Sequence, residues 1–325
     1  MKLAIYGYGN VGKGVECSVM QNSDVELTGI FTRRNKNDVK SVFNSKIYSV
    51  SEIDNFKDDI DVLAICGGSA TELPVMTVSL AKKFNVIDTF DTHANIYEHF
   101  TNVDKAAKES SHIAMISCGW DPGMFSLNRL YAKAILPKGK DYTFWGRGVS
   151  QGHSDAIRRI KGVIDAKQYT VPVESVVEKI KNGDMSDYTV REKHKRECFV
   201  VVEDGADKSS IENEIKTMPH YFDEYDTTVN FITMDEFKKN HTEMPHAGFV
   251  IRTGTTGKND EHKHTINYNL KLDSNPEFTA SAVVAFARAL YKEKQKGTTG
   301  CLTVFDIRPR DLINVDYTEL LKHML

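Results

Sequence analysis

The chain has 325 residues, and its 42 basic and 45 acidic side chains give a formal net charge of −3. This length suggests two domains, and so balanced a charge gives no indication of a nucleic-acid or membrane partner. No apolar run reaches the ~20 residues of a membrane span, and the first residues lack a signal-peptide pattern. The five cysteines are scattered and form no C-x-x-C pair, which argues against a disulfide framework or zinc site and fits a reducing cytoplasm.

The first 120 residues alternate between predicted strands and helices, judged by apolar periodicity and flanking glycines. Strands are expected at Lys2–Tyr6, Val25–Phe31, Asp61–Cys66, Asn85–Thr89 and Ile113–Ser117, and helices at Val11–Met20, Pro74–Phe84 and Tyr97–Ser110. Such alternation implies parallel pairing with right-handed crossovers. The predicted fold class is therefore α/β, with a doubly wound parallel (Rossmann-like) dinucleotide domain.

Past Asp121 the pattern changes to that of a second, α+β domain. A helix is expected to open at Asp121–Pro122, with the acid as N-cap and proline as its first residue. Strands are expected at Phe199–Val202, Thr228–Ile232 and Thr265–Leu272, and a solvated helix or loop at Lys179–Arg196. A long helix (Pro276–Lys296, capped by Asn275) and a final strand (Cys301–Ile307) follow. The expected division is residues 1–120 plus about 297–325 for the dinucleotide domain, and 121–296 for the substrate domain.

The stretch "GYGNVG" is a G-x-G-x-x-G motif that follows the first strand and opens a helix. Gly7 would allow the tight turn, Gly9 the approach of a pyrophosphate, and Gly12 the close packing of helix on strand. The helix N-terminus would then offer free N–H groups to the phosphates. The alternative is a glycine-rich turn without a ligand.

Thr32, Arg33 and Arg34 lie at the end of the second strand, where a protein that binds NAD usually keeps an acidic side chain. A carboxylate there would hold two ribose hydroxyls, whereas two arginines offer forked donors to a 2′-phosphate. The predicted cofactor is therefore NADP. The alternative is that both arginines are ordinary surface residues.

Unusual residues follow the later strands, and the carboxyl ends of parallel strands share the edge where ligands bind. "CGGSAT" begins at Cys66, "DTFD" ends at Asp91, and "SCGWDPGM" contains Trp120 and Asp121. Two carboxylates near a hydride acceptor suggest a substrate with a cationic group, and Trp120 would supply a flat wall. Asp121 could instead be an N-cap, Asp91 a turn residue and Trp120 a core residue.

The second domain offers groups suited to an anion. Glycines at 146, 148 and 152 lie among polar side chains in "FWGRGVSQGHSDAIRR", and such loops can point backbone N–H groups inward. His262 and His264 form an H-x-H pair without a nearby third ligand, so a solvated loop is favoured over a metal site. No metal is predicted.

Taken in order, these motifs resemble those of meso-diaminopimelate D-dehydrogenase. The resemblance rests on "GYGNVG", "TRR", "GSAT", "DTFDTH", "GWDPGMFSLNRLYA", "FWGRGVSQGHSDAIRRI", "KRECFVV", "MPHAG" and "LDSNPEFTAS", which span nearly the whole chain. It implies NADP-dependent, reversible oxidative deamination at the D-centre of meso-2,6-diaminopimelate, giving L-2-amino-6-oxopimelate and ammonia. It further implies a homodimer in the cytoplasm that serves lysine and peptidoglycan precursor synthesis.

The resemblance also implies roles for individual residues. Asp91 and Asp121 would lie at the reacting D-amino centre as catalytic candidates, and substrate binding would involve Trp120, Trp145, Gln151, Gly152, Thr170, Arg196, His246 and Asn275. Of these, Thr170, Arg196, His246 and Asn275 would hold the distal L-centre. Cofactor contacts would come from Gly7, Tyr8, Gly9, Asn10, Val11, Gly12, Thr32, Arg33, Arg34, Cys66, Gly67, Gly68, Ser69, Thr89 and Phe90.

Two other functions compete with this one. A dihydrodipicolinate reductase would use a His-rich helix and a lysine near the bound ring, and no such paired motif is present. A non-catalytic NADPH sensor would need the glycines and Arg33 and Arg34, but not Asp91, Asp121 or Trp145 in an enclosed pocket.

Overall fold

The computed structural model describes all residues from Met1 to Leu325, and the chain divides into two compact units. Unit 1 comprises Met1–Leu127 and Pro276–Leu325, and unit 2 comprises Asn128–Asn275. None of the helices combines the length and the apolar character that a membrane span requires.

Unit 1 is built on a seven-stranded sheet with the order β14-β6-β5-β4-β1-β2-β3, in which all neighbours pair in parallel. The strands are β1 (Lys2–Tyr6), β2 (Glu26–Thr32), β3 (Ile47–Ser49), β4 (Val62–Ile65), β5 (Val86–Asp88), β6 (Ile113–Met115) and β14 (Gly300–Leu302). The chain winds in one direction from β1 through β2 to β3 and in the other through β4 to β6, which confirms the predicted doubly wound sheet. The strand order reverses between β1 and β4, where ligands bind in such sheets.

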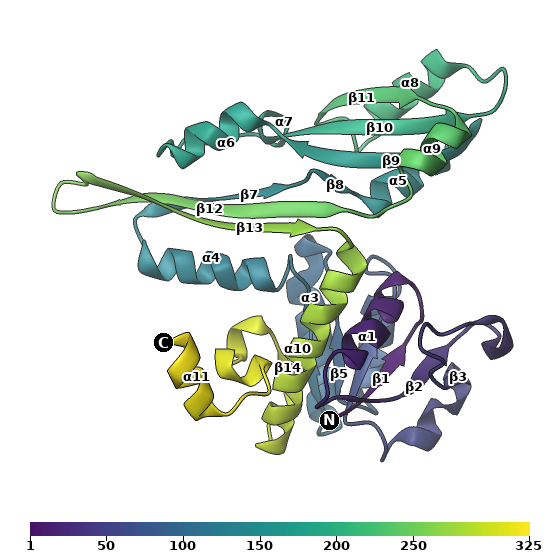
Figure 1. Cartoon of the computed structure of the whole chain (residues 1–325), viewed down its shortest axis with the longest axis vertical. Helices are drawn as coiled ribbons and strands as arrows, with labels where there is room; N and C mark the ends of the chain where they lie inside the picture. Colours follow the sequence, from purple (N-terminus) through teal and green to yellow (C-terminus); the bar gives the residue numbers. More distant parts are fainter. The chain divides into compact units, whose positions relative to one another are not determined.

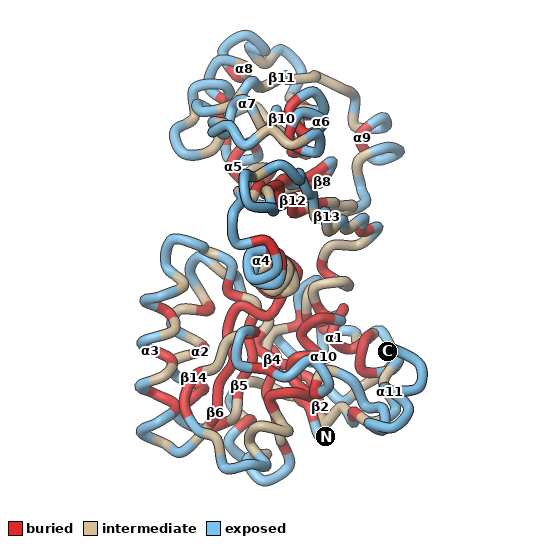
Figure 2. Tube along the Cα trace, turned by 90° about the vertical axis from the view of Figure 1, so that its left-hand side faces the viewer, coloured by how far each residue is buried: buried red, intermediate tan, exposed pale blue.

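Helices cover both faces of this sheet (Figure 1). Successive strand residues point to opposite faces. Leu3 and Ile5 of β1 pack in one apolar cluster with α1 (Asn10–Met20) and α10 (Asn275–Gln295), whereas Ala4 packs in another with α2 (Leu73–Ala81) and α3 (Ile96–Glu109). The strands are therefore buried on both sides, as the red trace of β4 to β6 shows (Figure 2). Short 3-10 turns lie at Lys36–Asp38, Val50–Phe56, His93–Asn95, Val304–Asp306 and Pro309–Leu312.

The C-terminal part of the chain completes unit 1. The predicted final strand does return to this sheet, as β14 beside β6, but it ends at Leu302 because Thr303 and Asp306 form a capping box that opens a 3-10 turn. The last helix is α11 (Tyr317–Met324). The prediction placed residues 276–296 in the second domain. Helix α10 instead belongs to unit 1, because its alanine and valine face is buried in the core around β1.

Unit 2 contains two sheets. One has the antiparallel order β13-β12-β7, and the other has the order β11-β10-β9-β8. The strands are β7 (Gly139–Trp145), β8 (Gly148–Val149), β9 (Val163–Pro172), β10 (His194–Val202), β11 (Asp226–Phe231), β12 (His246–Thr256) and β13 (His262–Leu272). The helices are α4 (Met124–Ile135, which starts in unit 1), α5 (Gln151–Arg158), α6 (Glu174–Lys181), α7 (Val190–Lys193), α8 (Lys208–Thr217) and α9 (Met234–Asn240). Apolar clusters join α5 and α8 to the four-stranded sheet and α6 to β7 and β12.

Three sequence predictions are wrong in this region. Asp121 and Pro122 do not open a helix, because Gly123 (φ +127°) and a bond from the Gly119 amide to the Pro122 carbonyl (3.0 Å) form a turn before α4 begins at Met124. The stretch 179–196 is not all solvated, since its last three residues enter β10 and Arg196 is buried. His262 and His264 are exposed, as expected, but lie in β13 and not in a loop.

Candidate active site

The glycine motif forms the turn from β1 into α1, and a side chain would meet different surroundings at each of the three glycines. Gly7 has φ +97°, and a Cβ there would lie 2.9 Å from the Cys66 carbonyl oxygen. A Cβ at Gly12 would lie 2.3 Å from the Gly7 carbonyl oxygen, so helix and turn could not pack. A Cβ at Gly9 would meet nothing within 4 Å. The space beside Gly9 and the uncapped N-terminus of α1, which has no acidic side chain in its first turn, fit a pyrophosphate.

Arg33 and Arg34 follow β2, and both are exposed. Arg34 Nη2 donates to the Tyr8 carbonyl oxygen at 2.6 Å, so it lies close to the glycine turn. Arg33 pairs with Glu72, whose carboxylate also accepts from the Gly68 amide at 2.6 Å. This amide and then Arg33 lower the pKa of Glu72. Glu72 therefore joins Arg33 to the turn that contains Cys66 to Ser69, a role that the sequence analysis missed.

Tyr8 and Glu16 form a buried polar pair beneath this surface. Tyr8 is 3% and Glu16 0% exposed, and the Tyr8 hydroxyl donates to the Glu16 carboxylate. The same carboxylate accepts from the amides of Val42 (3.0 Å) and Phe43 (3.2 Å) and from Ser45 Oγ (2.5 Å). The Tyr8 side chain therefore holds the segment before β3, and the backbone carbonyl of Tyr8 contacts Arg34.

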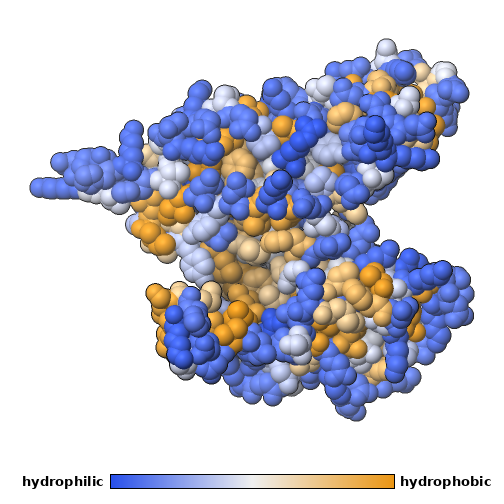
Figure 3. Space-filling model, viewed as in Figure 1, coloured by the Kyte–Doolittle hydropathy of each residue, from blue (hydrophilic) through white to orange (hydrophobic).

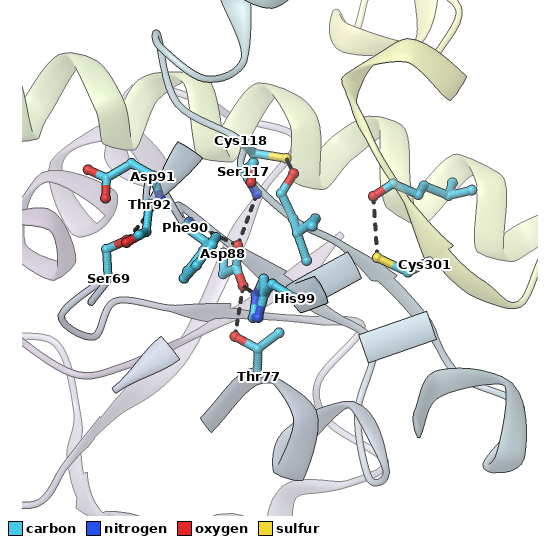
Figure 4. A network of polar contacts seen from close by, with 12 residues as sticks. Ser69, Thr77, Asp88, Phe90, Asp91, Thr92, His99, Ser117, Cys118 and Cys301 are labelled. Carbon is cyan, nitrogen blue, oxygen red and sulfur yellow. Dashed lines mark hydrogen bonds and ion pairs between the residues drawn. The ribbon is translucent and has the colours of Figure 1, made fainter. Parts of the chain in front are cut away.

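The ends of β4 and β5 are linked by a small hydroxyl network. Ser69 Oγ accepts from the Asp91 amide at 2.8 Å and lies 3.4 Å from Thr92 Oγ1, while the Asp91 side chain is exposed (Figure 4). Phe90 is 1% exposed and its ring stacks on His99 at 4.2 Å between ring centroids. Because that ring is enclosed and the Phe90 amide donates to Asp88, only the backbone carbonyl of Phe90 could contact a cofactor, beside the backbone of Thr89.

The segment that follows β6 has an unusual backbone conformation. Ser117 has φ +60°, a left-handed conformation that costs a residue other than glycine roughly 1–3 kcal/mol. Trp120 is 7% exposed and meets Phe125 edge-on at 5.4 Å. Asp121, two residues before the positive-φ Gly123, is half-buried. Strained backbone of this kind clusters at functional sites.

Asp88, the last residue of β5, is the centre of a hydrogen-bond network that the sequence analysis did not predict. It is fully buried, and its carboxylate accepts four hydrogen bonds, from Thr77, His99 and the amides of Phe90 and Ser117 (Figure 4). The sequence signal was an acid at the end of an otherwise apolar strand, directly before Asp91 in "DTFD".

Unit 2 contains a buried guanidinium. Arg196 in β10 is 6% exposed and lies directly opposite Thr170 in the antiparallel β9–β10 pairing, and Arg196 Nη1 donates to Thr170 Oγ1. The guanidinium carbon lies 3.9 Å from the centroid of the Tyr225 ring, while Nε has no hydrogen-bond partner. Burial lowers the pKa of Arg196, and Tyr225 acts in the opposite direction. A buried cation with neutral partners is a site prepared for an anion.

His246 is brought to the same place by strand register. Gly148 in β8 pairs with Thr170, and a Cβ at Gly148 would lie 2.6 Å from His246 Cγ. The imidazole therefore sits directly over a glycine next to the Thr170–Arg196 pair. Burial lowers the pKa of His246, which favours the neutral ring.

The remaining predicted residues of unit 2 lie nearby. Trp145 is 36% exposed, and its ring stacks on His194 at 5.7 Å. Gln151 and Gly152, both exposed, begin α5, and Gln151 Nε2 lies 2.9 Å from Met244 Sδ. The backbone N–H of Asn275 donates to the Met244 carbonyl at 3.1 Å. Not every backbone N–H of the glycine loop can donate to an anion, because the Gly146 N–H already donates to the Ala247 carbonyl at 2.6 Å.

Comparisons with known proteins agree with this geometry. Residues 119–274 match the family model described as "Diaminopimelic acid dehydrogenase C-terminal domain". A meso-diaminopimelate D-dehydrogenase of Acetivibrio thermocellus is 57% identical, with 100% of this chain and 98% of the relative covered. Two solved structures are also similar, each covering 100% of this chain and 99% of theirs. They are the C. glutamicum DAP dehydrogenase in complex with DAP (45% identity, TM-score 0.92) and an engineered D-amino acid dehydrogenase bound to NADP+ (43%, 0.87). The predicted resemblance is confirmed: the chain belongs to the meso-diaminopimelate D-dehydrogenase family.

Proposed function

We propose that this chain is an NADP-dependent dehydrogenase that oxidatively deaminates the D-centre of meso-2,6-diaminopimelate. The reaction consumes water and NADP+ and yields L-2-amino-6-oxopimelate, ammonia, NADPH and a proton, and it is reversible. The full-length relationship to enzymes of that name, up to 57% identity among the relatives compared, carries the proposal. The geometry of each unit supports it independently, through a nucleotide turn in unit 1 and a buried anion site in unit 2.

Unit 1 is assigned to the cofactor, which when bound accepts a hydride from the substrate carbon. The turn from Gly7 to Gly12, with Tyr8, Asn10 and Val11, would hold the pyrophosphate, and Thr32, Arg33 and Arg34 the 2′-phosphate. Cys66, Gly67, Gly68 and Ser69, with the backbone of Thr89 and Phe90, would border the rest of the nucleotide. The open space at Gly9 and the two exposed arginines support this assignment.

The substrate is a seven-carbon chain with an ammonium and a carboxylate at each end. We assign Asp91 and Asp121 to the reacting D-centre, with Trp120 and Trp145 as walls and Gln151 and Gly152 at the border. We assign Thr170, Arg196, His246 and Asn275 to the distal L-centre. Both ends must be fixed at once to distinguish the two centres, because specificity is a difference of affinities. The buried Arg196 supports a carboxylate as the distal group.

The protonation state of the substrate sets the expected pH dependence. Hydride loss from carbon requires the neutral amine, whereas a carboxylate beside an ammonium stabilises the charged form. We therefore expect oxidation to be fastest at alkaline pH. A rate that falls between about pH 7 and pH 10 in enzyme that stays folded would contradict this hypothesis.

We further infer that the protein is a homodimer that acts in the cytoplasm. Apolar surface supports an association: Leu130, Tyr131 and Ile135 of α4 are exposed, Ile135 by 71%, and orange patches lie over α4 and the C-terminal segment (Figure 3). Light scattering after size-exclusion chromatography should give twice the chain mass of 36.6 kDa. A mass of one chain at micromolar concentration would contradict the dimer.

The function is tested by absorbance at 340 nm with NADP+ and each stereoisomer of diaminopimelate at alkaline pH. We expect NADPH to form with the meso isomer and not with the L,L isomer, and much faster than NADH forms from NAD+. Protein that binds NADPH but turns over none of these substrates would contradict the proposal and favour a cofactor sensor.

A further inference from the structure

The Asp88 carboxylate makes one hydrogen bond in each of the four directions available to it. Oδ1 accepts from the amides of Phe90 and Ser117, both at 3.0 Å. Oδ2 accepts from Thr77 Oγ1 at 2.8 Å and lies 2.7 Å from His99 Nε2. Two carboxylate oxygens offer about four acceptor positions. The side chain is therefore fully satisfied and fixed in one orientation.

These four bonds join two pairs of elements. Thr77 is in α2 and His99 is in α3, so two helices hold Oδ2 from one side. On the other side, Phe90 directly precedes Asp91, and Ser117 begins the segment that leads to Trp120 and Asp121. The Asp88 carbonyl adds a bond from the Cys118 amide at 2.9 Å. A single residue thus fixes the two strand ends that carry both carboxylates assigned to the D-centre.

Burying a carboxyl group at this position costs free energy. Burying a charge costs far more than burying an apolar side chain, and it is tolerated where every hydrogen bond is made. The bond to the Ser117 amide also restrains a residue with φ +60°, a conformation that persists when its surroundings impose it. One hydrogen bond therefore joins the strained backbone after β6 to the buried carboxylate at the end of β5 (Figure 4).

We propose that Asp88, held by Thr77 and His99, is a positioning residue for the hydride-transfer step. It sets the spacing of the Asp91 and Trp120–Asp121 segments so that the D-centre meets the hydride acceptor correctly, without touching the substrate itself. The inference rests on the proposed function and extends it to a residue outside the binding surface. It predicts a much larger loss in the chemical step than in cofactor affinity.

The main variant is Asp88→Asn, whose amide nitrogen cannot accept the bonds now made by one oxygen. We expect kcat to fall by about 10²-fold, the effect typical of a misplacement near 1 Å. NADP+ affinity, followed by fluorescence, should change far less than kcat, since the residues assigned to the cofactor phosphates are untouched and only the Phe90 backbone borders the nucleotide. The deuterium isotope effect on kcat with substrate deuterated at the D-centre should rise, because hydride transfer becomes more rate-limiting.

Two further variants separate positioning from folding. Thr77→Val keeps the shape but removes one donor, and Thr77→Ser retains the hydroxyl. We expect a drop of several-fold in kcat with valine and recovery with serine, about the effect of one hydrogen bond. Arg288→Met, a control in α10, breaks the partly buried pair with Asp24 (Nε–Oδ2, 2.5 Å) far along the chain from the strand ends. It should lower thermal stability without changing the isotope effect.

The outcomes distinguish the possibilities. If Asp88→Asn loses stability as Arg288→Met does but keeps the wild-type kcat and isotope effect, the residue is a fold anchor and the inference is wrong. If Asp88→Asn does not fold, equal kcat in the valine and serine variants of Thr77 overturns it. A wild-type protein without turnover would overturn the proposed function together with this inference, whereas unchanged variants of an active enzyme would overturn the inference alone.

Discussion

Replacing Arg196 by methionine should weaken substrate binding and at the same time stabilise the free protein. In the structure the guanidinium is 6% exposed and its partners, Thr170 and Tyr225, are neutral. The free protein therefore contains a buried cation whose counter-charge, in our proposal, is the distal carboxylate of the substrate. Methionine has a similar length and no charge, so it retains most of the packing.

The size of each effect follows from the contacts. A hydrogen bond to a charged group contributes about 1.5–3 kcal/mol, so the loss of a two-point contact with a carboxylate costs about 3–6 kcal/mol. This corresponds to an increase in KM of about 10²- to 10⁴-fold. Removing a buried charge that lacks an ionic partner should raise the free energy of unfolding by about 1–2 kcal/mol, net of the lost bond to Thr170.

Two assays test this reasoning. Steady-state kinetics with meso-diaminopimelate give KM and kcat, and thermal unfolding without substrate gives the stability. Arg191→Met is the matched control, because Arg191 is an exposed arginine of the same unit that pairs with Asp226 on the surface. Arg191→Met should change neither the free energy of substrate binding nor the free energy of unfolding by more than about 0.5 kcal/mol. An unchanged KM for Arg196→Met would refute the distal role, and a large fall in melting temperature would refute the account of the buried charge.

Three further predictions concern cofactor and pH. Gly9→Ala should keep wild-type stability and lose NADP+ affinity, whereas Gly12→Ala should unfold more easily, because its Cβ would lie 2.3 Å from a backbone oxygen. Calorimetry measures the stability of each variant, and fluorescence titration measures its affinity for NADP+. Replacing Arg33 and Arg34 by serine should raise the KM for NADP+ by about 10²-fold or more and leave that for NAD+ nearly unchanged; equal changes would contradict a 2′-phosphate site. Burial lowers the pKa of His194 to about 3, and its Nε2 accepts from the Trp145 amide at 3.0 Å. The contribution of His194 to the free energy of unfolding is complete above about pH 6.5 and is lost as the pH falls toward 3. Between pH 6.5 and pH 5, the free energy of unfolding in urea should therefore fall by about 2 kcal/mol more in the wild type than in His194→Gln. Equal falls in the two proteins would contradict this prediction.

Local patterns predicted the glycine turn and the cofactor site of unit 1 because these features are local. The positive φ of Gly7 and the contact of Gly12 with the Gly7 carbonyl arise within one turn between adjacent elements, and the acid-free end of β2 lies directly before Arg33 and Arg34. The parallel strands are short apolar runs, which periodicity identifies well. The error at Asp121 had a physical cause, because an acid followed by proline favours a helix start as well as a turn, and Gly123 decided for the turn.

Long-range register explains what the sequence could not predict from pattern alone. Arg196 and Thr170 are opposite each other across β9 and β10, and Gly148 allows His246 to pack beside them, although these residues are far apart in the chain. Resemblance supplied these residues, whereas spacing did not. Tyr225 beneath Arg196 and the four bonds of Asp88 were missed because they depend on how separate elements meet in space.

The central claim, hydride transfer from the D-centre, is tested most directly by isotope transfer. Two samples of meso-diaminopimelate, one deuterated at the D-centre carbon and the other at the L-centre carbon, are oxidised with NADP+, and the cofactor product is analysed by mass spectrometry. We predict that deuterium reaches the reduced cofactor from the D-centre alone, with one ammonia released per NADPH. Transfer from the L-centre, or NADPH formed without ammonia, would contradict the proposed reaction.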